Sequence, residues 1–175
     1  RWCDAGRWPA PRCLPGAEAA LLTDLAWLGL DWDERPWRQS ERLEHYAAAL
    51  QSLQRSGRAY ACTCSRKEIE AVASAPHGDE GPLYPGTCRS GPSHPDRVPA
   101  WRFRMDAVEA FGDGLCGPQV GWRDDFVLQR ADGLFSYQLA CAVDDAAQGV
   151  TEVVRADDLL SSASRQQALL KALSL

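Results

Sequence analysis

Apolar residues recur at helical spacing in two segments of the first third of the chain. Leucines three or four positions apart predict a packed helix between residues 16 and 29, which ends at Gly29. Ser40 is the expected N-cap of a second helix, which ends at Gly57. One face of this helix carries an apolar stripe of Leu43, Tyr46, Ala47, Leu50 and Leu53.

Shorter segments of alternating or β-prone residues follow. We expect strands at residues 58–63, 101–105, 126–129, 134–139 and 149–155, and helices at residues 66–73 and 164–175. Ser65 and Glu68 have the spacing of a capping box at the start of the first of these helices. Asp132 and Gly133 are typical of a hairpin turn. Residues 74–99 contain six Pro and four Gly, so the pattern favours an α/β domain interrupted by an insertion.

Composition and charge narrow the class of protein. The chain has 175 residues, 45% hydrophobic and 25% charged, which fits one globular domain or one domain with a small inserted module. No apolar run has the length of a membrane span and the N-terminus lacks the form of a signal peptide, so we expect a cytoplasmic protein. A net charge of −5 argues against coating nucleic acid by bulk electrostatics. A local phosphate-binding patch or a solvated charged face is compatible with Arg66, Lys67, Arg89, Arg97, Arg102 and Arg104.

Three cysteines and a tyrosine form the most informative pattern of the chain. One residue separates Cys62 from Cys64, so both side chains lie on one side of an extended strand. Tyr84 and Cys88 are four positions apart across a Pro-Gly turn. Thiolates are ligands that Zn²⁺ prefers, and a structural site closes with four ligands. We therefore expect one structural zinc ion, which orders the loop of residues 74–99.

The residues alone leave alternatives for this site. Tyr is an uncommon zinc ligand, and either His77 or His94 is a candidate for the fourth position. The cysteines are otherwise small buried thiols that pack as hydrophobic residues. Seven cysteines, an odd number, do not have the pattern of a disulfide framework.

Several segments resemble one family in uninterrupted order from about Pro11 to the C-terminus. They are DLAWLGLDWDE, QSERLEHYAAALQSL, GRAYACTCSRKEI, YPGTCR, DFVLQRADGLFSYQLACAVDDAAQGVTEVVRADDLL and SRQQALL. Together they resemble the glutamyl-Q tRNA(Asp) synthetases, small paralogues of glutamyl-tRNA synthetase without an anticodon-binding domain. The resemblance implies an α/β fold: a Rossmann-type class I aminoacyl-tRNA synthetase catalytic core with a small zinc-binding insertion.

This resemblance also implies a domain order and a two-step reaction. Residues 1–61 match the first part of the catalytic core, residues 62–123 a zinc-binding acceptor-type insertion, and residues 124–175 the second part of the core. In the implied reaction, L-glutamate attacks the α-phosphorus of ATP, with Mg²⁺, and gives glutamyl-adenylate and pyrophosphate. The glutamyl group then passes to queuosine in the anticodon of tRNA(Asp). We expect the protein to be a monomer.

Site residues follow from the same resemblance. The implied zinc ligands are Cys62, Cys64, Tyr84 and Cys88. Tyr137 and Arg155 match positions that contact L-glutamate in relatives, and a planar guanidinium can hold a carboxylate by two parallel bonds. Asp144 and Asp145 are expected to shape the pocket wall. Without the family context, the residues favour a surface ion pair of Arg155 with Asp157 or Asp158, and a core aromatic role in a hairpin for Tyr137.

The chain departs from the family pattern in three places. Relatives have a His-Ile-Gly-His type segment for the ATP phosphates, but the first His here is His45. They also have a Lys-Met-Ser-Lys-Ser type loop, whereas the only lysines here are Lys67 and Lys171. The Glu that receives the substrate amino group falls on Gly6, and residues 1–12 are aberrant. We therefore expect a chain that is truncated at both ends or frameshifted, that carries no catalytic residue of those segments and that alone forms no glutamyl-adenylate.

Two other functions stay open. One is an ordinary glutamyl-tRNA synthetase that charges tRNA(Glu), although the Tyr-x-x-x-Cys spacing and the segment EVVRADDLL argue against it. The other is a non-catalytic, zinc-stabilised module that binds tRNA or another protein.

Overall fold

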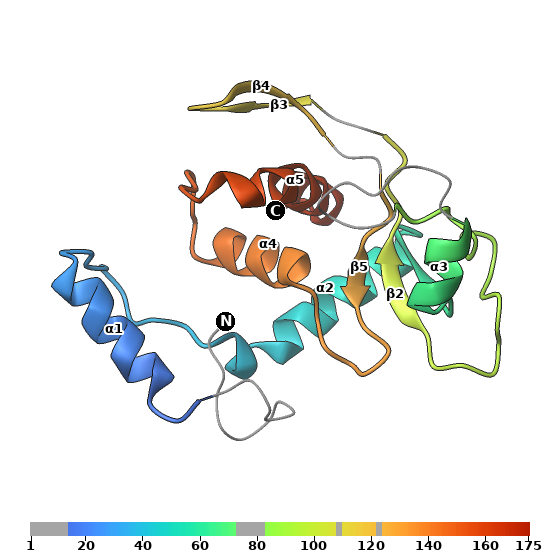
Figure 1. Ribbon diagram of the computed structural model, residues 1–175, viewed down its shortest axis with the longest axis horizontal. Helices are drawn as coiled ribbons and strands as arrows, with labels where there is room; N and C mark the ends of the chain where they lie inside the picture. The colour runs from blue at the N-terminus through green and yellow to red at the C-terminus, as the bar shows by residue number, and fades with distance from the viewer. Residues whose placement is uncertain (1–13, 73–82, 108–109, 122–123) are drawn as a thin grey trace. The chain divides into compact units, whose positions relative to one another are not determined.

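The structure is a computed structural model with two compact units. It describes residues 14–72, 83–107, 110–121 and 124–175 (Figure 1). The first unit is Arg1–His45 and the second is Tyr46–Leu175. Each unit is described by itself below.

The first unit contains the predicted helix α1, Ala17–Trp27. Gly29 follows this helix with a φ of 75°, the left-handed conformation that glycine adopts most easily. However, none of the residues of α1 is buried. The prediction that this helix is packed through its leucines is therefore wrong for this unit, and an apolar residue such as Trp27 is 84% exposed.

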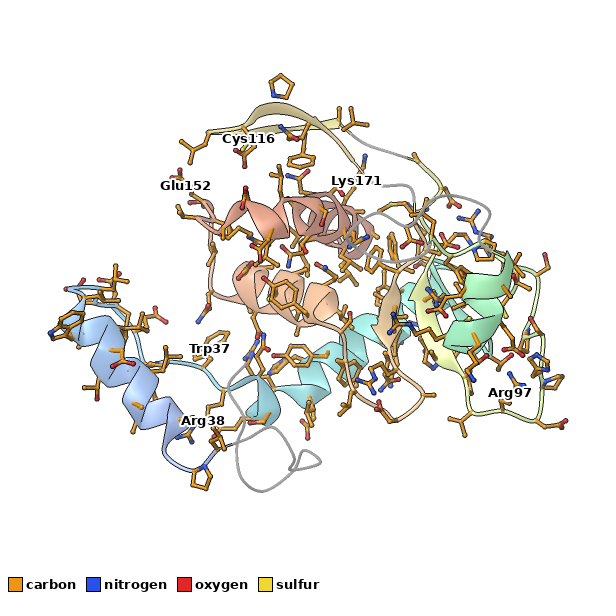
Figure 2. The ribbon with its side chains drawn as sticks, viewed as in Figure 1. Trp37, Arg38, Arg97, Cys116, Glu152 and Lys171 are labelled. Atoms are coloured by element: carbon orange, nitrogen blue, oxygen red, sulfur yellow. The ribbon has the colours of Figure 1, made fainter. Side chains whose placement is uncertain are left out.

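The start of the second helix also differs from the prediction. Ser40 lies inside a short 3₁₀ helix, η1 at Gln39–Glu41, and helix α2 begins only at Leu43 (Leu43–Arg55). Arg38 precedes η1 and pairs with Glu41 at 3.0 Å (Figure 2). Because this turn intervenes, Ser40 is not the N-cap of α2.

Helix α2 packs into the second unit as its apolar stripe predicts. Tyr46, Leu50 and Leu53 are buried, and Gly57, with a φ of 71°, follows the end of the helix. The hydroxyl of Tyr46 donates to Asp144 Oδ2 at 2.6 Å. This bond satisfies a buried carboxylate and joins α2 to a helix far along the chain.

A three-stranded antiparallel sheet follows, with the strand order β1-β2-β5. The strands are β1 at Ala59–Cys62, β2 at Ala100–Phe103 and β5 at Val127–Gln129. They confirm three of the predicted strands. Cys62 is paired with Ala100, so the sheet joins the strand before α3 to the strand that directly follows the Pro- and Gly-rich stretch. The most deeply buried side chains of the unit include Tyr46, Leu53, Phe103, Leu128, Leu139 and Leu169.

The hairpin predicted around Asp132 and Gly133 is only half correct. A turn is present, because the amide of Gly133 donates to the carbonyl of Arg130 at 2.9 Å. Beyond it, the expected strand at residues 134–139 is wrong: only Phe135 forms an isolated bridge to β5. Ser136 caps helix α4, Tyr137–Ala147, by accepting from the Leu139 amide, so the chain turns into a helix.

The expected strand at residues 149–155 is wrong as well. This segment is irregular, and its apolar side chains are exposed, with Val154 at 90%. No described strand pairs with it, so its β-prone residues have no ladder to join. The last helix, α5, spans Leu160–Leu173 after the 3₁₀ helix η2 (Asp157–Leu159) and begins four residues earlier than predicted. Helices α4 and α5 lie side by side (Figure 1).

Two smaller elements complete the second unit. Helix α3, Arg66–Val72, has the predicted capping box: Glu68 accepts from the Ser65 amide at 2.6 Å, and Ser65 Oγ accepts from the Glu68 amide at 3.3 Å. Strands β3 (Ala110–Asp113) and β4 (Gly117–Val120) form a separate antiparallel hairpin. Among the described residues, no helix has the length and apolar character needed to cross a membrane.

Candidate functional site

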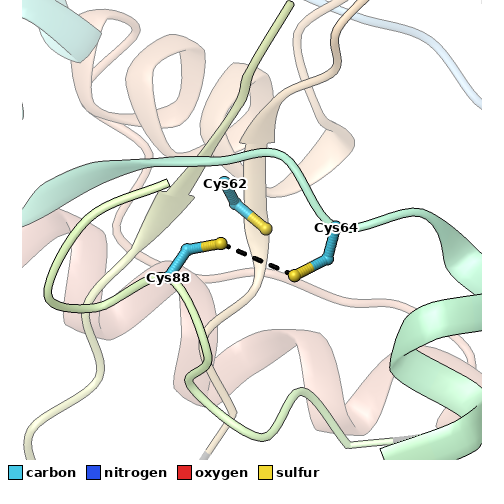
Figure 3. Close-up of side chains that lie close together, drawn as sticks. All are labelled: Cys62, Cys64 and Cys88. Atoms are coloured by element: carbon cyan, nitrogen blue, oxygen red, sulfur yellow. Dashed lines mark hydrogen bonds between the residues drawn. The ribbon is translucent and has the colours of Figure 1, made fainter. Parts of the chain in front are cut away.

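Three thiols converge where β1 ends and the loop around Cys88 returns to it (Figure 3). The Sγ atoms of Cys62, Cys64 and Cys88 all lie within 4.8 Å of one another. Cys64 Sγ and Cys88 Sγ are 3.5 Å apart. In a tetrahedral site with Zn–S bonds of ~2.3 Å, sulfur atoms lie about 3.8 Å apart. The spacing of the three thiols therefore fits a shared ion.

Tyr84 brings an oxygen atom to the same place. Its hydroxyl oxygen lies 3.3 Å from Cys62 Sγ and 3.8 Å from Cys64 Sγ. The same oxygen accepts from the Cys88 amide at 2.9 Å. The side chain is almost fully buried, in a cluster with Tyr60 and the three thiols. We call Cys62, Cys64, Tyr84 and Cys88 the sulfur cluster.

A tight turn in the loop explains how Tyr84 and Cys88 meet. Gly86 has a φ of 80°, which disfavours any residue with a side chain. A Cβ atom there would also lie 3.3 Å from Arg89 Cδ. On the other side of the cluster, Thr63 Oγ1 accepts from the His94 amide at 2.9 Å and fastens the later part of the loop to the end of β1.

The electrostatics of the cluster differ from one group to the next. Burial acts to raise the pKa of Cys88, but hydrogen bonds from Ser93, Tyr84 and nearby backbone outweigh it and lower the pKa to about 5. Burial raises the pKa of Cys64. Burial and the neighbouring thiols raise the pKa of Tyr84. One sulfur is thus a ready thiolate, the form that binds a metal.

The two histidines are the alternatives for the fourth ligand, and the structure describes only His94. The His94 imidazole lies against Glu68, with Nε2 3.0 Å from Oε1, rather than in the group of converging thiols. Glu68 also pairs with Arg97 at 2.9 Å (Figure 2). His77 lies outside the described residues. Among those described, the donor set is three sulfurs and a phenol oxygen, a soft set that suits Zn²⁺ better than Mg²⁺ or Ca²⁺.

A buried carboxylate supports the loop that carries Tyr84 and Cys88. Asp125 is 3% exposed and accepts from the Tyr60 hydroxyl at 2.5 Å and from Arg89 at 2.6 Å through each oxygen. Next to it, Asp124 Oδ1 accepts from the Tyr84 amide at 3.0 Å. The guanidinium of Arg102 stacks over the Tyr84 ring at 3.9 Å. Arg89 and Arg102, two members of the scattered basic set of this region, thus have structural partners.

Tyr137 and Arg155, the two residues expected to contact L-glutamate, lie on α4 and in the irregular segment after it. Arg155 Nη1 donates to Gln166 Oε1 on α5 at 2.7 Å. Burial raises the pKa of the Tyr137 phenol. The neighbouring Cys141 raises it further, through its charge and a hydrogen bond, whereas the Arg155 charge acts to lower it. Both predicted residues are therefore within electrostatic reach of each other. We call the group of Tyr137, Arg155 and Gln166 the polar pocket, a name that stands for these three side chains and not for a cavity.

The two expected wall residues do different things. Asp144 is buried and accepts the Tyr46 hydroxyl, so it faces the core. Asp145 is only partly buried, and burial raises its pKa while the Arg155 charge acts to lower it. Of the two, Asp145 is the residue whose carboxyl interacts with the Arg155 charge.

Comparison with known proteins identifies the family of this chain. The family model for tRNA synthetases class I (E and Q), catalytic domain, matches residues 10–175. The chain belongs to this family. It therefore has the catalytic domain of a class I tRNA synthetase, of mixed helix and strand content.

Its relatives within the class I tRNA synthetases include proteins named glutamyl-Q tRNA(Asp) synthetase. The one from Nitratidesulfovibrio vulgaris is 48% identical over 90% of this chain and 55% of its own length. The one from Deinococcus radiodurans is 51% identical over 86% of this chain and 52% of its own length. The chain thus spans about half the length of the curated relatives it matches.

Solved structures of class I synthetases support the fold. A glutamate tRNA ligase from Elizabethkingia meningosepticum, in complex with its amino acid, superposes with a TM-score of 0.75 at 23% identity over 95% of this chain and 39% of that chain. The glutamate-tRNA synthetase of Elizabethkingia anophelis gives 0.76 at 24% identity over 94% and 39%.

Sequence reasoning missed two residues that lie beside the predicted site residues. Gln166 lies in SRQQALL, eleven residues beyond Arg155, and nothing local marks it as a partner of that arginine. Asp125 precedes a strand, and its contacts with Tyr60 and Arg89 come from distant segments. The one signal for Gln166 is its place on the buried face of α5, where a polar side chain needs hydrogen-bond partners.

Proposed function

We propose that this chain belongs to a glutamyl-Q tRNA(Asp) synthetase, which activates L-glutamate with ATP and transfers it to queuosine in the anticodon of tRNA(Asp). The observation that carries the proposal is the identity of 48 to 51% to proteins of that name, along 86 to 90% of this chain. The same names favour this function over an ordinary glutamyl-tRNA synthetase.

In this proposal, Arg155 and Tyr137 hold the amino acid. The guanidinium of Arg155 pairs with the side-chain carboxylate of L-glutamate through two parallel hydrogen bonds, which a lysine cannot reproduce. The Tyr137 hydroxyl is a second hydrogen-bonding group at the same site. Activation then joins the α-carboxylate of glutamate to the α-phosphorus of ATP, a co-substrate that carries Mg²⁺, and releases pyrophosphate.

The sulfur cluster is proposed to hold one structural zinc ion, with Cys62, Cys64, Tyr84 and Cys88 as ligands. Zinc there would tie the end of β1 to the loop of residues 83–99, because a site that is absent from the unfolded chain converts metal-binding energy into folding energy. We also propose that residues 62–123 are an acceptor-type insertion between residues 1–61 and 124–175 of a Rossmann-type core.

Binding of L-glutamate to the full 175-residue chain tests the polar pocket directly. Titration calorimetry is expected to detect L-glutamate in preference to L-glutamine. Arg155→Lys is expected to weaken L-glutamate binding about tenfold or more, because a hydrogen bond to a charged group contributes about 1.5–3 kcal/mol. Arg130→Lys is the matched control, since Arg130 is an exposed arginine that pairs with Asp132. Equal losses in the two variants would refute the assignment.

The adenylate step needs a separate measurement. The sequence has neither a His-Ile-Gly-His nor a Lys-Met-Ser-Lys-Ser type segment, so we expect no glutamate-dependent exchange of pyrophosphate into ATP by this chain alone. Exchange above a no-enzyme blank would overturn this expectation. Transfer to tRNA(Asp) with and without queuosine, and to tRNA(Glu), separates the two synthetase functions in any longer active form.

A further inference from the structure

Gln166 is an unusual residue for the interior of a helix pair. It lies on the face of α5 that also buries Leu169, and it is only 5% exposed. Its Oε1 accepts from Arg155 Nη1 at 2.7 Å. Burying a carboxamide costs free energy unless hydrogen bonds compensate, so an apolar residue would pack here more cheaply. The side chain is therefore explained by what it does to Arg155.

The other end of the same carboxamide faces the remaining member of the pocket. Gln166 Nε2 is buried and has no close hydrogen-bond partner among the described residues. The amide is nevertheless near enough to Tyr137 to act against the rise that burial causes in the pKa of the phenol. One side chain on α5 thus contacts Arg155 firmly and reaches toward Tyr137 on α4.

The chemistry of the amide suits this position better than that of an acid. A glutamate at position 166 would form an ion pair with Arg155 and compete with a carboxylate ligand for the same guanidinium. A neutral carbonyl oxygen holds one N–H of Arg155 but leaves its positive charge for the ligand. Asp145 is an acidic side chain of this chain whose charge already interacts with Arg155.

We propose that Gln166 is a positioning residue, which fixes the Arg155 guanidinium so that its remaining N–H groups face the side-chain carboxylate of the amino acid. This inference rests on the proposed function for the identity of the ligand, but not for the orientation of Arg155. An arginine side chain carries considerable rotamer entropy, and fixing it in advance lowers the cost of binding.

Two variants and one control test the proposal in the full chain. Gln166→Leu removes the acceptor at similar volume, and Gln166→Glu keeps an acceptor but adds a charge. Gln167→Leu is the matched control, because Gln167 is the exposed neighbour on the same helix. The readouts are the ¹⁵N NMR signals of the Arg155 guanidinium, assigned with Arg155→Lys, and the dissociation constant of L-glutamate. Gln166→Met replaces the Leu variant if that one does not fold.

The expected pattern separates orientation from charge. Gln166→Leu should speed rotation of the Arg155 guanidinium and weaken L-glutamate about fivefold to tenfold, the worth of one lost hydrogen bond. Gln166→Glu should keep the guanidinium ordered yet weaken L-glutamate more than the Leu variant does. Gln167→Leu should change neither readout.

The outcomes that oppose the proposal are distinct from a failure of the proposed function. Guanidinium signals that are unchanged in Gln166→Leu overturn it, whatever happens to binding. If the wild-type chain binds no L-glutamate, the ligand assignment of the pocket fails, and the Arg155 signals still decide whether Gln166 orients the guanidinium.

Discussion

The sulfur cluster and the polar pocket are built in opposite ways. The cluster draws its groups from two short segments that β1 and the following loop bring together. The three sulfurs lie within 4.8 Å of one another, and the phenol oxygen lies 3.3 and 3.8 Å from two of them. The pocket takes Tyr137 from α4, Arg155 from an irregular segment and Gln166 from α5. A hydrogen bond of 2.7 Å joins Arg155 to Gln166.

This difference predicts different consequences of damage. A closed set of mutually touching donors is part of the folded core, so its loss should lower stability. Polar groups on three separate elements that one hydrogen bond joins contribute less to folding, so their loss should lower ligand affinity more than stability.

Loss of one cluster thiol should have the largest effect. Cys62→Ser is expected to reduce bound zinc well below one ion per chain and to lower the unfolding temperature strongly, because metal binding and folding of the loop are coupled. Metal analysis and thermal unfolding measure both. Cys116→Ser is the control, since Cys116 is exposed on the β3–β4 hairpin (Figure 2). Equal zinc content in the two variants would show that Cys62 is not a zinc ligand.

Asp125 should matter through its charge. Burial acts to raise its pKa, but Arg89 and Tyr60 outweigh burial and hold the pKa below its ordinary value. The group therefore stabilises the fold above the ordinary Asp pKa of about 3.9, and this contribution is lost as pH falls below it. Asp125→Asn is expected to cost about 3 kcal/mol at neutral pH, the low end for a broken buried ion pair, because Arg89 is 34% exposed.

Denaturant unfolding at neutral pH and at a pH below about 3 checks this sign. The difference between the wild type and Asp125→Asn should shrink in acid. A difference of constant size would mean that the carboxylate charge is not what stabilises the loop. Asp132→Asn, at an exposed ion pair with Arg130, serves as the control.

Tyr84→Phe isolates the oxygen of the cluster. It leaves the Cys88 amide without its acceptor, and an unsatisfied buried donor costs about 1–3 kcal/mol. Zinc should still bind, but more weakly, because three sulfurs remain. Competition with a chelator and denaturant unfolding measure the two effects. If chelator competition gives the same zinc affinity as for the wild type, Tyr84 is not a ligand.

The smallest effect is expected at the helix that follows the cluster. Ser65→Ala removes the hydroxyl that accepts from the Glu68 amide, and loss of such a cap typically costs about 1 kcal/mol. Ser90→Ala, at an exposed serine of the loop, is the comparison. A shift in unfolding midpoint no larger than that of Ser90→Ala would show that the capping box does not stabilise α3.

The features that the sequence predicts well are those determined by neighbours along the chain. The capping box of α3 and the stop at Gly57 depend on residues within one turn, and both are confirmed. The approach of Tyr84 to Cys88 follows from a short turn at Gly86. In each case the deciding contact is local, so spacing is sufficient to predict it.

The features that it misses depend on distant partners. Residues 134–139 favour a strand by composition, but the Ser136 cap begins a helix there that packs against α5. Val153 and Val154 are β-prone and remain irregular, because no described strand lies in position to pair with them. Gln166 meets Arg155 only through the packing of α5, a contact that no sequence spacing encodes.

X-ray absorption at the zinc edge of the purified chain tests the central claim most directly. The proposed cluster predicts one zinc ion with three sulfur ligands at ~2.3 Å and one oxygen ligand at ~2.0–2.2 Å. A zinc ion surrounded by four sulfurs, or by nitrogen and oxygen alone, would contradict the assignment of Cys62, Cys64, Tyr84 and Cys88. So would a chain that retains no zinc when it is purified in its reduced form.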